Sequence, residues 1–389
     1  MKNRLIKKAL QENLFVLYYQ PKINLHTKKV DSIEALIRIK DGENLIYPEE
    51  FIADAEKSGD IFDIDRWVFN QVIEDSRYIS MMTQDDISIA LNVSATHFTQ
   101  DSFLENLEDI FDLTTDFISN FELEFTEYSL IENKEDALSK MQKLKEKGFK
   151  IAIDDFGTGY SSFVYLKDFP IDSIKIDKSF IDDLEIDEKT SKIVESILFL
   201  AKKLDLKVVA EGVEKVNQVQ WLFDHGCDEI QGYYYSKAVS IDKLVKFIQA
   251  VNQPASKNDF IVWGDKYSIG NYAFDTHHMI IASILNKLYK ELKDESMKEK
   301  SEVESYFALL NRYIEIHFQA EESYMKEINY KDIKAHMKLH QDFKEILEEF
   351  KKSLSNSNKK NVYELFKILK DWLINHELKV DKLLVKQKK

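Results

Sequence analysis

The sequence predicts an α/β chain in two parts, a (β/α)8 TIM-like barrel followed by an all-α antiparallel four-helix bundle. Short apolar runs alternate with helical patterns over the first two thirds of the chain, whereas only long helical patterns follow. The length of 389 residues exceeds that of a single ordinary core. Glycine and proline are scarce, with 10 and 4 copies, which favours long helices.

Eight runs in the first part have the composition of strands. They span residues 16–24, 32–39, 87–94, 121–127, 150–156, 173–180, 206–213 and 229–236. Most are separated by stretches with helical periodicity, such as 134–148 and 188–206. Strands that alternate with helices favour a parallel barrel, with the first two strands as an irregular hairpin. We expect this domain to span residues 1–251.

Residues 252–262 read as a polar linker that contains the last proline of the chain, Pro254. Beyond the linker, the pattern predicts only helices, at 275–294, 301–327, 330–355 and 360–386. Long helices joined by short connections favour an antiparallel bundle. We expect this second domain to span residues 263–389.

Composition narrows the functional class. The only cysteine, Cys227, excludes an intramolecular disulfide and fits a reducing compartment. The basic N-terminus has no apolar signal region and no apolar run is long enough to span a bilayer, so we expect a cytoplasmic chain. Residues 1–250 carry 30 Lys/Arg against 47 Asp/Glu, which argues against binding a nucleic-acid polymer. A phosphorylated substrate would need bridging cations, although acidity also serves solubility.

Polar residues follow the predicted barrel strands where such barrels hold their active sites. They are Glu34, Arg38, Asn92, Glu124, Asp154, Asp155, Lys175, Glu211 and Gln231. Taken alone, the pair Asp154–Asp155 could solvate the glycine turn that follows it. So many acids on one rim would repel one another without a cation, and their oxygen atoms suit Mg²⁺ or Mn²⁺.

These motifs carry a family resemblance. Glu34-Ala35-Leu36, the run DDFGTGYSS from Asp154 and the run AEGVE from Ala210 are together similar to an EAL domain, over about residues 5–250. The resemblance implies a two-metal phosphodiesterase that hydrolyses cyclic di-GMP to linear pGpG. It implies that one metal is held by Glu34, Asn92, Glu124 and Asp154, and that Asp154 bridges to a second held by Asp155 and Glu211.

The same resemblance implies roles for other residues. Lys175 would orient the attacking water or offset developing charge, with Glu211 or a metal hydroxide as the base. The substrate would be fixed by Gln20, Arg38 and Gln231. Glu127, Glu214 and the loop Phe156–Ser162 would couple metal binding to a homodimer formed through the barrel. The alternative is a solvated loop with two surface acids.

The second part concentrates histidine. Five of the nine histidines lie between 278 and 376, each with a carboxylate or histidine at ligand spacing. A lone histidine on an apolar face is usually a core residue, but five in one bundle favour a metal site. The pairs His317–Glu321 and His336–His340 are i, i+4 and share a helix face. Asp381 follows His376 by five residues, about 140° around a regular helix, which is the weakest part of the pattern.

This region resembles hemerythrin across about residues 263–389. The carried-over ligands are His278, His317, Glu321, His336, His340, His376 and Asp381. The resemblance implies two non-haem irons, one bound by three histidines (336, 340, 376) and the other by two (278, 317). Two bridging carboxylates and an oxo or hydroxo bridge would leave one coordination position for O2. A mononuclear zinc site is the alternative, although seven ligands exceed its usual number.

The leading hypothesis is a phosphodiesterase whose di-iron domain senses O2 or redox state. Nitric oxide or iron supply stay open as other signals. Two hypotheses from other classes remain: a non-catalytic cyclic di-GMP receptor, and an O2 or iron carrier fused to an inert barrel. Metal-dependent hydrolysis would distinguish an enzyme from a non-catalytic receptor. Reversible O2 binding that leaves hydrolysis unchanged would identify a carrier.

Overall fold

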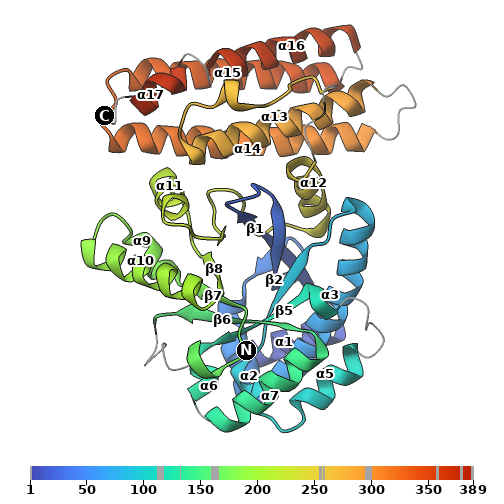
Figure 1. The fold of residues 1–389 in the computed structure, drawn as a ribbon. Helices are drawn as coiled ribbons and strands as arrows, with labels where there is room; N and C mark the ends of the chain where they lie inside the picture. Colours follow the sequence, from blue (N-terminus) through green and yellow to red (C-terminus); the bar gives the residue numbers. More distant parts are fainter. Residues whose placement is uncertain are drawn as a thin grey trace. The chain divides into compact units, whose positions relative to one another are not determined.

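The structure is a computed structural model (Figure 1). It describes residues 2–111, 118–131, 133–158, 166–253, 256, 259–293, 300–355, 359–376 and 380–386. The chain forms two compact units. One comprises Met1–Val213 and His225–Val245, and the other comprises Glu214–Asp224 and Lys246–Lys389. The chain passes between the units three times: inside the AEGVE segment, after Asp224, and inside the helix α12 (Ile241–Val251).

The first unit is a closed barrel, which confirms the predicted fold. Within the described residues, eight strands form the ring, and they are β1 (Phe15–Asn24), β2 (Val30–Asp41), β4 (Ser88–Asn92), β5 (Phe121–Thr126), β6 (Lys150–Phe156), β7 (Ser173–Ile176), β8 (Lys207–Ala210) and β9 (Glu229–Ile230). Each pair of neighbouring strands from β2 through β4 to β9 is parallel. β1 closes the ring by pairing antiparallel with both β2 and β9, as the expected hairpin irregularity. A short strand, β3 (Asn44–Ile46), adds to β2 and was not predicted.

Helices cover the outside of the ring (Figure 1). They are α1 (Lys2–Gln11), α2 (Ile52–Ser58), α3 (Ile61–Thr83), α4 (Ala95–Phe98), α5 (Phe103–Phe111), α6 (Glu127–Ile131), α7 (Lys134–Lys147), α9 (Lys178–Asp182) and α10 (Glu188–Lys203). Because side chains fill the inside and helices cover the outside, barrel strands are buried on both faces. All four residues of β7 are buried.

Several strands end earlier than predicted because a cap begins the next helix. Ser94 accepts a hydrogen bond from the backbone of His97 and starts α4 two residues after β4. Asp177 accepts from the backbone of Ser179 and starts α9 directly after β7. Short polar side chains at such positions satisfy the free N–H groups of a helix start. These caps fix where each strand tip lies, and therefore where its functional side chain stands.

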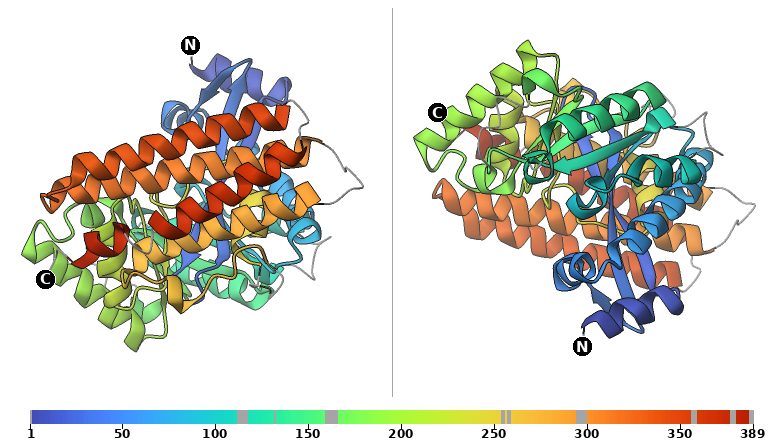
Figure 2. Two further views of the ribbon diagram at one scale, coloured as in Figure 1. Left: turned by 90° about the horizontal axis from the view of Figure 1, so that it is seen from above. Right: turned by 90° about the horizontal axis from the view of Figure 1, so that it is seen from below.

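The second unit is built on a helical bundle, again as predicted. Its long helices are α13 (Tyr272–Lys293), α14 (Lys300–Glu327), α15 (Ile333–Ser355) and α16 (Lys359–His376), followed by the short α17 (Lys382–Lys386). Consecutive long helices pack against one another with nearly parallel axes (Figure 2). Of the last expected helix, 360–386, the described residues form α16 and α17, and residues 377–379 lie outside the described residues. The unit also includes α11 (Val216–Asp224). None of the described helices combines the length and the apolarity needed to cross a membrane.

Candidate metal centres

The polar residues of the barrel gather at the carboxyl ends of its strands. The register pairs Asn92 of β4 with Glu124 of β5, and Thr126 of β5 with Asp154 of β6. Asn92 donates a 2.7 Å hydrogen bond from Nδ2 to Glu34 Oε1. Parallel strands with matched tips thus bring side chains from distant parts of the chain to one rim.

A buried lysine stands at the centre of this group. Lys175, 1% exposed, places its Nζ 2.7 Å from Glu124 Oε2 and 2.8 Å from Glu211 Oε1. The same ammonium lies 3.1 Å from Asp154 Oδ1 and 3.8 Å from Glu34 Oε2. Burial opposes its charge, but these four carboxylates outweigh burial and raise the pKa of Lys175 well above its usual value. The rim of the barrel therefore holds four carboxylates around the ammonium group of Lys175, a candidate site for a cation.

The carboxylates divide by environment. Burial, opposed by Lys175, raises the pKa of Glu211 to about 8, and burial also raises the pKa of Glu34. Burial acts in the same direction on Glu124, but its two lysine neighbours prevail and hold its pKa at about 2. A divalent cation bound beside Glu211 and Glu34 would favour their ionised forms.

The adjacent aspartates occupy one side of the rim because the backbone bends between them. Asp155 has φ +53°, in the left-handed region that Asp tolerates better than most residues, and the β6–β7 register shifts between Ile153 and Phe156. An oxygen of each of Asp154, Asp155 and Glu211 lies within 4.8 Å of the others. A regular strand would have pointed the two neighbours to opposite faces.

The expected substrate-binding residues frame this rim. Gln231 donates from Nε2 to Glu34 Oε2 at 2.5 Å and to Gln20 Oε1 at 3.1 Å. Arg38 lies on the same face of β2 as Glu34, four residues on. Its guanidinium stacks 4.8 Å from the Tyr47 ring centre, and its Nε makes no hydrogen bond to any described residue. These side chains offer amide and guanidinium donors beside the carboxylates.

The two expected coupling acids lie in different surroundings. Glu127 is buried and accepts a 2.9 Å hydrogen bond from the Gly157 backbone at Oε1. Glu214 is exposed, belongs to the second unit, and its backbone N–H donates to Gln218 Oε1 at 2.8 Å. Of the expected loop, residues 156–158 are described, and 159–162 lie outside the described residues. Glu127 thus anchors the start of that loop.

Among the charged residues of the barrel interior that sequence reasoning missed is Lys22 of β1. It is fully buried, and its Nζ lies 2.8 Å from Glu124 Oε1. Lys22 lies two residues after Gln20 on the same strand, and alternate residues of a strand share a face. This spacing could have indicated that Lys22 points into the barrel together with Gln20.

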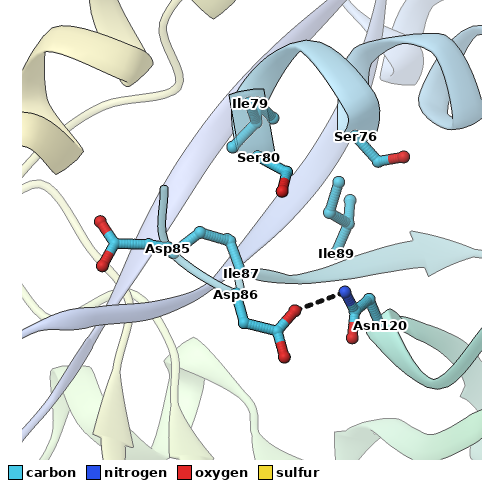
Figure 3. A pocket seen from close by; sticks show the side chains of 8 residues that line it. All are labelled: Ser76, Ile79, Ser80, Asp85, Asp86, Ile87, Ile89 and Asn120. Carbon is cyan, nitrogen blue, oxygen red and sulfur yellow. Dashed lines mark hydrogen bonds between the residues drawn. The ribbon is translucent and has the colours of Figure 1, made fainter. Parts of the chain in front are cut away.

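Two cavities lie at the opposite, amino-terminal ends of the strands. One, of about 400 Å³, is lined by Asp31, Ser32, Asp86, Ser88, Asn120, Glu122, Lys150, Asp172, Ser173 and Lys207. The other is far smaller, about 10 Å³, and in it Asn120 donates to Asp86 Oδ1 (Figure 3). Residues at this end of a barrel usually serve stability.

In the bundle, the structure brings all seven expected ligands together. Two groups of candidate ligand atoms, each within 4.8 Å of one another, share Glu321. One group is Glu321, His336, His340 and His376, and the other is His278, His317, Glu321 and Asp381. Every member is at most 4% exposed.

Both carboxylates face the two groups with different oxygens. Glu321 Oε2 lies 2.9 Å from His340 Nε2, whereas its Oε1 lies 3.6 Å from His317 Nε2. Asp381 Oδ1 lies 3.2 Å from His376 Nε2, and its Oδ2 lies 3.5 Å from His278 Nε2. A carboxylate that offers one oxygen to each of two neighbouring groups has the geometry of a bridge between two metal ions.

Asp381 joins the cluster although it follows His376 by five residues. Val380 and Asp381 lie in a π-helical turn, which is wider than a regular helical turn and often occurs at functional sites. Asp275, three residues before His278, is not among these ligands. Its carboxylate accepts from the Ile269 backbone at 2.8 Å and from Ser268 Oγ at 2.6 Å, and so fixes the chain before α13.

The electrostatics of this cluster fit a cation. Burial lowers the pKa of His278 to about 4, and it lowers the pKa of His317 and His376 as well, so these rings are neutral ligands at pH 7. Nε2 of His278, His317 and His336 is buried without a hydrogen-bond partner among the described residues. Unsatisfied buried nitrogens are costly, and a shared metal centre would satisfy them.

Known proteins match both parts of the chain. The EAL domain family matches residues 3–238, and the hemerythrin HHE cation binding domain family matches residues 270–387. The signaling protein YkoW of Bacillus subtilis is 38% identical over 252 residues, 64% of this chain and 31% of that protein. The cyclic di-GMP phosphodiesterase NbdA of Pseudomonas aeruginosa is 34% identical over 246 residues, 63% of this chain and 31% of that protein.

The match therefore spans about a third of the length of these two relatives. Among solved structures, a PaMucR phosphodiesterase in complex with c-di-GMP is similar with a TM-score of 0.59 and 33% identity, over 62% of this chain and 98% of that chain. The chain belongs to the EAL domain family and carries a C-terminal hemerythrin HHE cation binding domain.

Proposed function

We propose that the barrel hydrolyses cyclic di-GMP to linear pGpG. The observation that carries this proposal is the set of four carboxylates around Lys175 at the carboxyl ends of the strands. Relatives named as cyclic di-GMP phosphodiesterases and a similar structure that holds c-di-GMP support it. In the reaction, water adds to one phosphorus and the bond to the 3′ oxygen breaks, which leaves a 5′ phosphate and a 3′ hydroxyl.

Two divalent cations, Mg²⁺ or Mn²⁺, would supply charge neutralisation at the phosphate and acidify the attacking water. The residues that would hold them are Glu34, Asn92, Glu124, Asp154, Asp155 and Glu211. Lys175 would offset the negative charge that develops on the phosphate. Gln20, Gln231 and Arg38 would orient the substrate, Arg38 by its fork of donors to a phosphate oxygen.

The test is product formation by the full chain. Chromatography of cyclic di-GMP incubated with the protein and Mn²⁺ or Mg²⁺ should show pGpG, which chelation of the cation and Glu34→Ala should each abolish. Binding of the nucleotide without cation-dependent product would show a receptor instead of an enzyme. Hydrolysis unchanged by Glu34→Ala would contradict the assignment of the site.

We further propose that a non-haem di-iron centre in the bundle regulates this activity in response to O2 or redox state. Helix α11 supports a physical connection, because it begins five residues after Glu211 and yet belongs to the second unit. Within that unit, Phe223 of α11 stacks on Tyr272 at 3.9 Å between ring centres. Tyr272 opens α13, the helix that carries His278, and its backbone N–H donates to Gln220 Oε1 at 2.8 Å.

Two experiments test this regulatory part. Iron analysis of the purified chain should give two irons per chain, which one zinc would contradict. Rates of pGpG formation should differ between the ferrous and the ferric protein, and a nitric oxide arm separates that signal from O2. A reversible O2 adduct that leaves hydrolysis unchanged would favour a carrier.

We also propose that the barrel forms a homodimer and that Glu127 links it to the site through the loop it anchors. The hydrogen bond from Gly157 to Glu127 supports this role. Light scattering should show a dimer, and Glu127→Ala should lower hydrolysis without removing the metal ligands. A fully active monomer would contradict the proposal.

A further inference from the structure

Two carboxylates of β5 point into the barrel. Glu122 and Glu124 are two residues apart on one strand, so they share a face. Glu124 stands at the rim with the other candidate metal ligands. Glu122 stands one layer deeper, where its Oε2 accepts a 2.9 Å hydrogen bond from Ser173 and its side chain lines the 400 Å³ cavity. Two neighbouring carboxylates repel one another unless a positive charge lies between them.

Lys22 of β1 stands between them. Its Nζ lies 2.8 Å from Glu124 Oε1 and 3.6 Å from Glu122 Oε1, and its side chain is 0% exposed. Lys175 binds the other oxygen of Glu124, at 2.7 Å. The rim carboxylate is therefore held by one ammonium group on each oxygen, and its plane is fixed by two side chains from different strands.

A purely structural role explains this arrangement poorly. The interior layers of such barrels are usually filled by branched apolar side chains, and a fully buried lysine is rare unless it is paired. Replacing a buried ion pair by well-packed apolar residues often leaves stability unchanged or increases it. The presence of a charged Lys22 inside the barrel is thus better explained by its contact with Glu124 than by a gain in stability.

We infer that Lys22 is a positioning residue that fixes the Glu124 carboxylate for cation binding at the barrel rim. The inference rests on the proposed metal-dependent function of that rim. The ammonium group of Lys22 forms its ion pairs with Glu122 and Glu124. It acts through Glu124, as outer residues orient the ligands of many metal sites.

The test is direct Mn²⁺ binding by the full chain loaded with iron, followed by the electron paramagnetic resonance signal of free Mn²⁺. Lys22→Met removes the donor and keeps the aliphatic stem. Residues that orient a metal ligand typically change affinity about 10- to 100-fold, so we expect at least a tenfold weaker Mn²⁺ affinity. Glu122→Gln leaves the contact to Glu124 in place and should change the affinity by less than about twofold.

The double variant Lys22→Met/Glu122→Gln separates positioning from charge balance. If Lys22 only neutralises Glu122, the double variant regains wild-type affinity and the inference fails. If Lys22 positions Glu124, the double variant stays weak. Should Lys22→Met not fold, Lys22→Gln takes its place, and unchanged Mn²⁺ affinity in either variant overturns the inference. Wild-type protein that binds Mn²⁺ but does not hydrolyse cyclic di-GMP would refute the proposed function and leave this comparison valid.

Discussion

Lys175 Nζ lies 2.8 Å from Glu211 Oε1. The buried lysine thus forms an ion pair with the carboxylate that directly follows β8. Both residues belong to the first unit. Lys175 lies among the candidate metal ligands of the rim, and Glu211 lies three residues before the point at which the chain enters the second unit.

Lys175→Met should remove both hydrolysis and part of the stability of the metal-free chain. It leaves four carboxylates without their shared cation, and breaking a buried ion pair typically costs about 3–5 kcal/mol. We expect a lower melting temperature without cation, partial recovery with Mn²⁺, and a rate at least about 100-fold lower. Lys207→Met, at the amino-terminal end of β8, is the matched control and should keep the rate. Equal rates in both variants would exclude a role for Lys175.

Acid should destabilise the metal-free bundle over a defined range. The folded state holds the pKa of His278 at about 4 by burial, below its ordinary value of 6.5, so the unfolded chain binds more protons between these values. The contribution of His278 to the free energy of unfolding is fully present above about pH 6.5. It is lost as the pH falls toward 4, a loss on the order of 3 kcal/mol. Urea titrations of the metal-free chain measure this loss. His278→Leu should flatten the profile, whereas His26→Ala should not.

Glu322 should strengthen iron binding without being a ligand. Its Oε1 lies 3.1 Å from His340 Nδ1, and this hydrogen bond orients the ring whose Nε2 faces Glu321. Glu322→Ala should therefore weaken iron affinity about 10- to 100-fold, measured by competition with a chelator. Glu345→Ala on the exposed face of α15 is the control. An unchanged affinity in Glu322→Ala would mean that packing alone holds the ring.

Phe223→Ala should uncouple hydrolysis from the state of the iron. The stacked pair Phe223–Tyr272 connects α11 to α13, and such pairs contribute about 0.5–1.5 kcal/mol. The ratio between the rates of pGpG formation in the ferrous and the ferric protein should move toward one by about two- to tenfold. The average of the two rates should stay unchanged. Phe199→Ala, on the exposed face of α10, should leave the ratio unchanged. A ratio that survives Phe223→Ala would place the coupling elsewhere.

Much of this organisation follows from local sequence patterns. The alternation of apolar runs and helical stretches placed all eight ring strands, and i, i+4 spacing placed two ligand pairs of the bundle. What the patterns did not explain depends on the backbone at single positions. The left-handed conformation of Asp155 lets neighbouring carboxylates share one side of the rim, and Val380 and Asp381 lie in a π-helical turn where the sequence pattern assumes a regular helix.

Lys22 was missed for a different reason. A charged residue in a predicted strand reads as solvent-exposed, and only the closed ring shows that its side chain lies between Glu122 and Glu124. Likewise, the packing of α11 against α13 depends on partners far along the chain. Long-range contacts of this kind carry no local signature.

The most direct measurement is the rate of pGpG formation by the full chain with Mn²⁺, with the iron first ferrous and then ferric. The account predicts cation-dependent hydrolysis that differs between the two states and disappears in Glu34→Ala. The same rate in both states would contradict the proposed regulation, and the absence of pGpG under both conditions would contradict the proposed enzyme.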